Sequence, residues 1–294
     1  MTTKQRPDAG KSHGRSTSAF APKCTALWLA ALLSLGVTLA EAETPTRVVS
    51  MNLCTDQLAM MLAAPGQLIS VSSIAHDPFT SPMHIEAQAY PTNYGSAEEI
   101  FLLAPDLVLA GSYSNPTTIA MLRRLRLRVE QIDLVEDLSQ VATRLREVGE
   151  ILDRTAEAEA AVDVFEARLE ELRAPVPGGP LTAFYYPNGY TLGTETLSHE
   201  ILSAAGIPHL AERLGRAFSG RLALEELVMA DPAMIITSDP YPAASRSEEI
   251  LRHPAMRRLT EPHGAFVAGN EWICGTPHVL AALEELAHER AARQ

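Results

Sequence analysis

The chain has 294 residues, of which 46% are hydrophobic and 20% are charged, and its formal net charge at pH 7 is −12. This length and composition are typical of a globular protein with one or two domains and a sizeable core. A mean hydropathy of +0.00 argues against several membrane spans. The acidic balance argues against nucleic acid or anionic lipid as a partner.

Residues 1–42 have the pattern of a secretory signal peptide. Five basic residues precede the apolar run Ala26–Ala40, and Ala40 and Ala42 provide the small residues of a cleavage site. The run has about 15 residues, where a membrane span needs roughly 20. Export with cleavage after Ala42 removes five basic and two acidic residues, so the net charge becomes −15. Of the three cysteines, only Cys54 and Cys274 then reach an oxidising compartment.

Short strand-like runs alternate with helical stretches in the first half of the mature chain. The expected strands are Arg47–Asn52, Leu68–Ser72, Pro105–Ala110 and Val129–Leu134. A helix is expected directly after the first strand, and two more over Ala97–Leu103 and Thr117–Leu127. Strands that alternate with helices pair in parallel, so this half predicts an α/β layer structure.

Apolar residues then recur at helical spacing from Leu138 to Leu172. Asp153 and Thr155 are capping residues, so we expect one helix to end near Leu152 and a second to run to Arg173. The alternation resumes after the Pro- and Gly-rich segment 174–180. The expected elements are the strands Leu181–Tyr186, Met234–Thr237 and Ala265–Ala268, and the helices Leu197–Ala205, Glu248–Arg258 and Pro277–Ala291.

These patterns predict an α/β fold of two Rossmann-like lobes with parallel sheets, joined by a long rigid backbone helix. The expected division is a lobe over 43–152, the connecting helix over 153–174 and a second lobe over 175–294. An internal similarity supports two related lobes, because Glu98–Leu109 and Glu225–Ile236 both place an acidic pair seven residues before a proline, followed by an apolar strand. Such a pair of lobes suggests a bilobed binding protein.

Over about residues 46–291 the chain resembles the periplasmic cobalamin and ferric-siderophore binding components of ABC importers. The motifs that carry the resemblance are Arg47–Ser50 before a helix, Gly95–Ile100 with Pro105–Leu109, the echo at Glu225–Thr237, and Trp272 before the last helix. The resemblance implies a monomeric periplasmic receptor with no catalytic role and no cofactor. It captures a metal chelate or corrinoid between its lobes and delivers it to an ABC permease dimer.

The resemblance also implies a docking role for Glu98 and Glu225, one in each lobe, against arginines of the permease. Two carboxylates held apart by a rigid helix can orient a symmetric basic partner. The alternative is that both are ordinary solvated acids, which the helix dipole favours in a first turn.

The residues expected to contact the ligand are Asn52, Cys54, Thr55, His84, Tyr94, Arg221, Trp272 and Cys274. For Asn52 and Thr55 a role as helix cap is favoured over ligand contact, and Trp272 either stacks on a flat ligand or packs in the core. His84 and Tyr94 belong to a loop expected to border the cleft, and Arg221 is the candidate cation. Residues 272–276 are expected at the position in the second lobe that matches Asn52–Thr55 in the first.

Three interpretations of Cys54 and Cys274 remain open at this point. They are small buried hydrophobic residues, a disulfide across the cleft, or thiolate ligands of the cargo or of a soft metal. The third would make the protein a soft-metal or haem scavenger. A periplasmic hydrolase is a remote alternative, because no nucleophile or metal-protease motif occurs. No dedicated metal site is expected, since no H-x-x-H spacing occurs.

Overall fold

The computed structural model describes residues 43–238, 245–261 and 265–293. The expected signal peptide lies outside the described residues. By their contacts, Thr44–Gln294 form one compact unit. Within the part of the chain that is described, none of the helices combines the length and apolar character that crossing a membrane requires.

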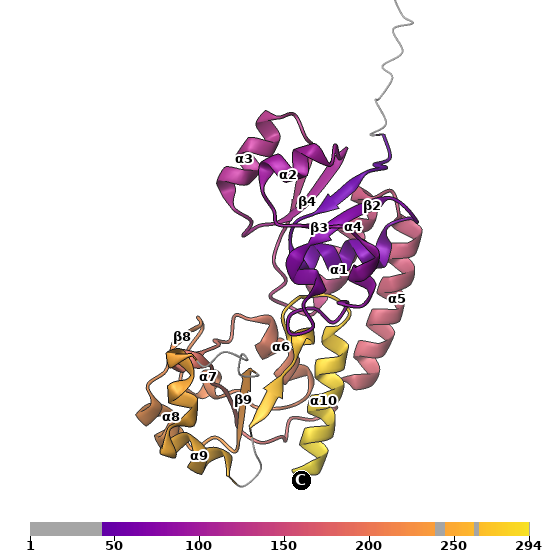
Figure 1. Cartoon of the computed structure of the whole chain (residues 1–294). Coiled ribbons are helices and arrows are strands. Elements are labelled where there is room, and N and C mark those ends of the chain that lie inside the picture. Colours follow the sequence, from indigo (N-terminus) through magenta and orange to yellow (C-terminus); the bar gives the residue numbers. More distant parts are fainter. Residues whose placement is uncertain (1–42, 239–244, 262–264, 294) are drawn as a thin grey trace, which may run out of the picture. The chain divides into compact units, whose positions relative to one another are not determined.

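The N-terminal lobe is built on a five-stranded parallel sheet with the strand order β3-β2-β1-β4-β5 (Figure 1). Its strands are β1 (Val48–Ser50), β2 (Leu68–Ser72), β3 (Thr92–Asn93), β4 (Leu107–Gly111) and β5 (Val129–Ile132). Its helices are α1 (Leu53–Leu62), α2 (Ala97–Leu102) and α3 (Pro116–Arg124), with 3-10 turns at Ser73–His76 and Glu86–Ala89.

Both faces of this sheet are covered, which explains why the residues of β1 and β4 are buried at every position. Side chains alternate between the faces, so Val49 and Val108 pack with α2 and α3, while Val48 and Leu107 pack with α1 and the helices that follow. Ser50 pairs with Leu109, so β1 and β4 end at the same edge of the sheet.

The C-terminal lobe contains a three-stranded parallel sheet in the order β10-β9-β6 and a small antiparallel β7-β8 pair. The strands are β6 (Thr182–Phe184), β7 (Tyr190–Thr191), β8 (Gly220–Arg221), β9 (Met234–Ser238) and β10 (Phe266–Ala268). The helices are α6 (Leu197–Ala204), α7 (Leu210–Arg213), α8 (Leu224–Ala230) and α9 (Pro254–Thr260). Short 3-10 turns lie at Pro187–Gly189, Arg246–Arg252 and Asn270–Trp272.

Three longer helices complete the unit: α4 (Ser139–Ile151), α5 (Thr155–Leu172) and α10 (Val279–Ala292) (Figure 1). Helices α4 and α5 pack closely because Gly149 has no side chain; a Cβ there would lie 2.3 Å from the Cβ of Ala158. One buried apolar cluster runs from Val48 in β1 through α5 to Leu286 in α10. The two sheets therefore share a continuous core along these helices.

The internal similarity of the sequence is also a similarity of structure. A residue with left-handed backbone follows the end of each of the helices α2 and α8, Ala104 at φ 46° and Asp231 at φ 47°, each directly before a proline. The next strands, β4 and β9, occupy equivalent places, because each pairs in parallel with the first strand of its lobe. A related unit is thus present in both lobes.

Two expectations about the C-terminal lobe are wrong. The expected helix Glu248–Arg258 is a 3-10 turn followed by α9, because Pro254 begins a new helix and cannot continue an old one. Residues 272–276 follow β10, which pairs with β9 as β5 pairs with β4. The equivalent segment of the first lobe therefore follows β5, and is not the corner after β1.

Candidate functional site

A recess lies at the carboxyl ends of β1, β4 and β5, where a parallel sheet most often holds a ligand. It is lined by Asn52, Cys54, Thr55, Leu58, Gly111, Ser112, Tyr113, Ile132, Asp133, Leu134, Val135, Arg144 and Gly275. The recess shares Tyr113, Asp133 and Arg144 with an adjoining hollow of about 440 Å³, to which Glu136 and Gln140 also contribute. An apolar wall beside a few polar groups is typical of a small-molecule site.

The corner after β1 forms one wall of the recess, and its polar groups are held within the fold. The Asn52 side chain accepts a hydrogen bond from the backbone N–H of Cys54 at 3.1 Å, which caps α1. The Thr55 hydroxyl lies 2.9 Å from the Asn52 carbonyl oxygen, to which it donates, and 2.8 Å from the Ser50 hydroxyl. Thr55 is buried. These contacts support the capping interpretation for Asn52 alone, because Thr55 lies inside α1 and its hydroxyl bonds the Asn52 carbonyl and Ser50.

Gly111 at the end of β4 makes room for this corner. A Cβ at position 111 would lie 2.9 Å from the side-chain Cγ of Asn52. The absence of a side chain at Gly111 therefore lets the Asn52 amide turn toward the start of α1 and complete its cap.

Cys54 and Cys274 form a disulfide, with their Cα atoms 5.3 Å apart. Of the three interpretations, the structure supports the disulfide and contradicts the thiolate one. A sulfur atom that is bonded to another sulfur is not available as a thiolate ligand, so neither cysteine binds the cargo or a soft metal in this way. The bond joins the first helix of the N-terminal lobe to the segment after β10, across 220 residues of chain.

Further contacts fasten the segment after β10 to the N-terminal lobe. The Thr276 hydroxyl donates a hydrogen bond of 2.8 Å to the side-chain oxygen of Gln57, and both residues are buried. Gly275 packs so closely that a Cβ there would lie 2.1 Å from the Cβ of Val135. Asn270 donates to the carbonyl of Pro78 at 2.8 Å. The floor of the recess is therefore built jointly by both halves of the chain.

Trp272 is a core residue, so the structure supports the core-packing interpretation over ligand stacking. Only 8% of its surface is exposed. Its ring meets Phe184 edge-on at a centroid distance of 5.8 Å and Phe266 at 6.2 Å. Because aromatic side chains of the protein surround the indole, no open face remains for a flat ligand.

Sequence reasoning missed several residues of the site, among them Tyr113, Asp133, Glu136 and Arg144. Arg144 lies on α4, lines both the recess and the hollow, and forms an ion pair with Glu147. Its Nε atom is buried and has no hydrogen-bond partner among the described residues. The helical period places Arg144 only at the edge of the buried face of α4, next to Val148. A charged residue at such a position needs a partner.

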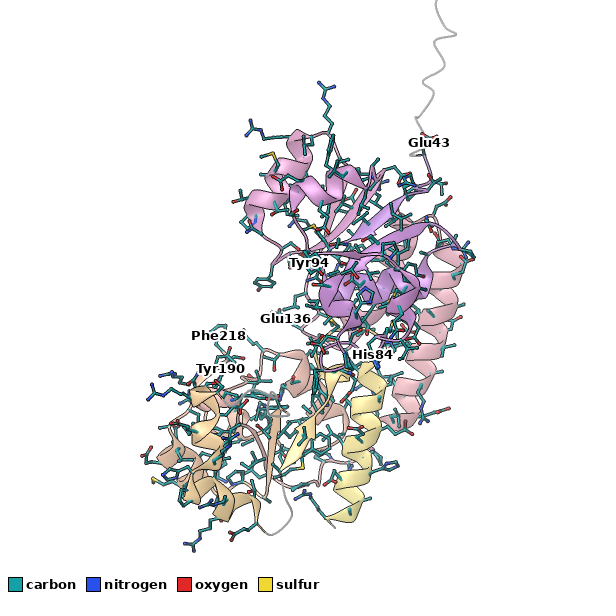
Figure 2. All side chains as sticks on the ribbon, viewed as in Figure 1. Glu43, His84, Tyr94, Glu136, Tyr190 and Phe218 are labelled. Atoms are coloured by element: carbon teal, nitrogen blue, oxygen red, sulfur yellow. A yellow bond between two sulfur atoms is a disulfide. The ribbon has the colours of Figure 1, made fainter. Side chains whose placement is uncertain are left out.

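His84, Tyr94 and Arg221 do not line the recess or the hollow. The His84 ring nitrogen Nδ1 lies 3.1 Å from the Ser81 carbonyl oxygen, and Arg221 is exposed on β8. Tyr94 is 79% exposed. Figure 2 shows Tyr94 at the lower edge of the N-terminal lobe and Phe218 at the upper edge of the C-terminal lobe. Ligand contact by His84, Tyr94 and Arg221 stays a prediction.

A second hollow of about 430 Å³ lies in the C-terminal lobe and is bordered by His199, Glu212 and Arg216. The Nδ1 atoms of His199 and His209 are 3.3 Å apart, and Nε2 of His199 is 3.6 Å from a Glu212 oxygen. Burial, with a smaller contribution from the neighbouring His199, lowers the pKa of His209 to about 4. Within the described residues no three His, Cys, Asp or Glu side chains converge on a metal position. Because its pKa is lowered, His209 is an uncharged core residue at neutral pH.

Residues 48–260 of the chain match the sequence model of a protein family, the periplasmic binding proteins. The chain belongs to this family. A curated cobalamin-binding protein of Halobacterium salinarum is 25% identical over 243 residues, covering 80% of this chain and 64% of the relative. The chain thus matches less than two thirds of that relative's length.

Solved structures of other periplasmic binding proteins share the fold. The haem-binding protein RhuT of Roseiflexus sp. RS-1 matches with a TM-score of 0.71 at 21% identity, over 84% of this chain and 99% of that one. The vitamin B12 binding protein BtuF of Vibrio cholerae matches with a TM-score of 0.63 at 19% identity, over 85% and 98%. These likenesses establish the two-lobe α/β architecture of the family for this chain.

Proposed function

We propose that this periplasmic binding protein captures a corrinoid or a metal chelate outside the inner membrane and hands it to an ABC permease. The observation that carries the proposal is the recess at the carboxyl ends of β1, β4 and β5, in a family whose curated relative is a cobalamin-binding protein. A partly preformed recess captures a ligand without catalysis. The expected signal peptide supplies the export that this role needs.

Within that class, the charges around the hollow favour a neutral amide-rich ligand over an anionic chelate. Asp133 and Glu136 line the hollow, while Arg144, its one lining cation, is already paired with Glu147. Carboxylates at the wall repel a catecholate or a carboxylate siderophore. They accept hydrogen bonds from amide N–H groups, and the guanidinium of Arg144, a residue that lines the hollow, donates to an amide oxygen. A corrinoid, whose rim carries amide groups, satisfies both.

Exposed aromatic side chains support the same ligand class. Tyr113 lines the recess and is 83% exposed. On the other lobe Tyr190 is 45% exposed and Phe218 is 76% exposed. Aromatic rings bind the apolar faces of large flat ligands at low entropic cost, so these residues, together with Tyr94, are the proposed apolar contacts.

A binding panel tests the ligand class. Residues 43–294, with the disulfide intact, are titrated with cyanocobalamin, haem, a ferric hydroxamate and a ferric catecholate by calorimetry. We expect cyanocobalamin to bind most tightly. Tighter binding of the catecholate would overturn the charge argument, and no binding by any of the four would overturn the ligand class.

A pair of variants on α4 tests the role of Arg144. Loss of one charge-assisted hydrogen bond costs about 1.5–3 kcal/mol, so Arg144→Gln should weaken binding about ten-fold or more. Arg146→Gln is the matched control, because Arg146 lies on the same helix, is 45% exposed and pairs with Glu159 at 3.0 Å instead of lining the site. Equal affinities of the two variants would exclude Arg144 as a ligand contact.

The second part of the proposal is that Glu98 and Glu225 dock the receptor on the permease. Both are exposed in the first turns of equivalent helices, α2 and α8. We expect Glu98→Lys and Glu225→Lys to weaken association with the cognate permease in nanodiscs and to leave cyanocobalamin affinity unchanged. Equal losses of both activities would point to a folding defect and contradict the docking role.

A further inference from the structure

Each docking helix exposes two large apolar side chains beside its glutamate. On α2, Phe101 is 46% and Leu102 is 82% exposed; on α8, Val228 is 39% and Met229 is 84% exposed. Single exposed apolar residues need no explanation. Two matched pairs at equivalent positions of a repeated unit need an explanation. Each pair leaves in water an apolar surface that folding could have buried.

The pairs are presented in the same way because the two units have the same local structure. In both, the residue before the pair is fully buried, Ile100 in α2 and Leu227 in α8, and anchors the helix to its lobe. A left-handed residue, Ala104 or Asp231, follows the end of each helix. The buried residue and the left-handed residue fix the rotation of each helix about its axis, so the same face points outward in each lobe.

Helix geometry places each apolar pair next to the docking acid. The pair follows Glu98 or Glu225 by three and four residues, and residues at those spacings share one face of a helix. The second acid of each unit is used within its lobe: Glu99 accepts from the backbone N–H of Tyr94 at 2.8 Å, and Glu226 pairs with Arg216 at 3.1 Å. No side-chain hydrogen bond or ion pair joins Glu98 or Glu225 to another residue in the described part of the chain.

We propose that each lobe docks through a combined contact, one acid and the apolar pair beside it, and that both contacts are made to like subunits of one permease dimer. The inference rests on the proposed function and names the chemistry of the partner surface: a cation with an apolar side chain next to it, presented twice. Apolar side chains that close around an ion pair exclude water and strengthen it. The acids then steer the encounter, and the apolar pairs hold the complex.

The test separates these two contributions by kinetics. The full exported receptor, loaded with cyanocobalamin, is bound to its permease in nanodiscs at 50 mM and 500 mM salt. We expect Leu102→Gln with Met229→Gln to raise the dissociation rate about ten-fold, with the association rate and its salt dependence unchanged. Glu98→Gln with Glu225→Gln should instead slow association and flatten its salt dependence.

The control variant is Val164→Gln, which changes an apolar residue on α5 that is 70% exposed but lies outside both units. It should dissociate at the wild-type rate. Wild-type dissociation of the Leu102→Gln, Met229→Gln receptor, with the acid variants still impaired, would overturn the apolar contact and leave the proposed function standing. Failure of the wild-type receptor to bind the permease would overturn both.

Sedimentation of the wild-type receptor tests whether a second copy of this chain, and not the permease, covers the apolar pairs. We expect a monomer at all concentrations tested. A dimer that Leu102→Gln with Met229→Gln dissociates would assign the apolar pairs to self-association and overturn the proposal.

Discussion

Reduction of the Cys54–Cys274 disulfide is expected to destabilise the receptor strongly. The bond closes a loop of 220 residues, which is most of the compact unit Thr44–Gln294. A crosslink stabilises a fold mainly by removing conformations from the unfolded chain, and the benefit grows with the logarithm of the loop length. For a loop of this length the chain-entropy relation gives about 5 kcal/mol.

The expected size of the effect in a melting experiment follows from the chain length. A change of 1 kcal/mol shifts the melting temperature of a protein of 150–250 residues by roughly 2–4 °C. The reduced receptor should therefore melt about 10–20 °C below the oxidised one. The native contacts around the bond, such as Thr276 with Gln57, do not need the bond itself, so the reduced protein should still fold at 20 °C.

Calorimetry on residues 43–294, which contain only these two cysteines, measures the difference with and without a phosphine reductant. Cys54→Ala with Cys274→Ala is the matched control, because it should melt near the reduced wild type and ignore the reductant. Equal melting temperatures for the oxidised and reduced wild type, with thiol labelling confirming reduction, would refute the loop-entropy argument.

Two further predictions concern single residues. Gly275→Ala places a methyl group in the space of Val135 and should lower the free energy of unfolding, measured in urea, by about 1–3 kcal/mol. Gly220→Ala is the control and should be nearly neutral, because nothing lies near its Cβ position. Equal effects of the two variants would refute the packing argument. Burial raises the pKa of Asp56 to about 6, so the folded state binds more protons than the unfolded state between about pH 4 and pH 6, and stability falls as pH rises through this window. Relative to wild type, Asp56→Asn should gain about 3 kcal/mol between pH 4 and pH 7.5, and an unchanged difference would contradict the raised pKa.

Local sequence patterns were sufficient to predict most of the regular structure. The strand expected over Met234–Thr237 is β9 (Met234–Ser238), and the helix expected from Thr155 is α5 (Thr155–Leu172). These predictions succeed because a continuous apolar run or a helical period marks a buried element within a few residues of sequence. The error at Pro254 arose where a proline divides an otherwise uniform helical pattern.

The candidate site was harder to predict, because it depends on which distant residues meet. Sequence reasoning identified the corner at Asn52 and Cys54 but assigned no role to Arg144, whose burial depends on how α4 packs. It left Trp272 undecided between core and cleft, since an indole suits both. Neither question can be answered from neighbouring residues, because burial is a property of the packed unit.

The sequence by itself determined the α/β class, the repeated helix–proline–strand unit and the positions of Glu98 and Glu225, since each is written in short-range pattern. Only the tertiary structure decided that Cys54 bonds Cys274, that Gly275 packs on Val135 and that Arg144 lines the site. These contacts join residues far apart in the chain, and they exist only when both sheets pack on one core. The geometry of the candidate site therefore depends on long-range packing that no local pattern encodes.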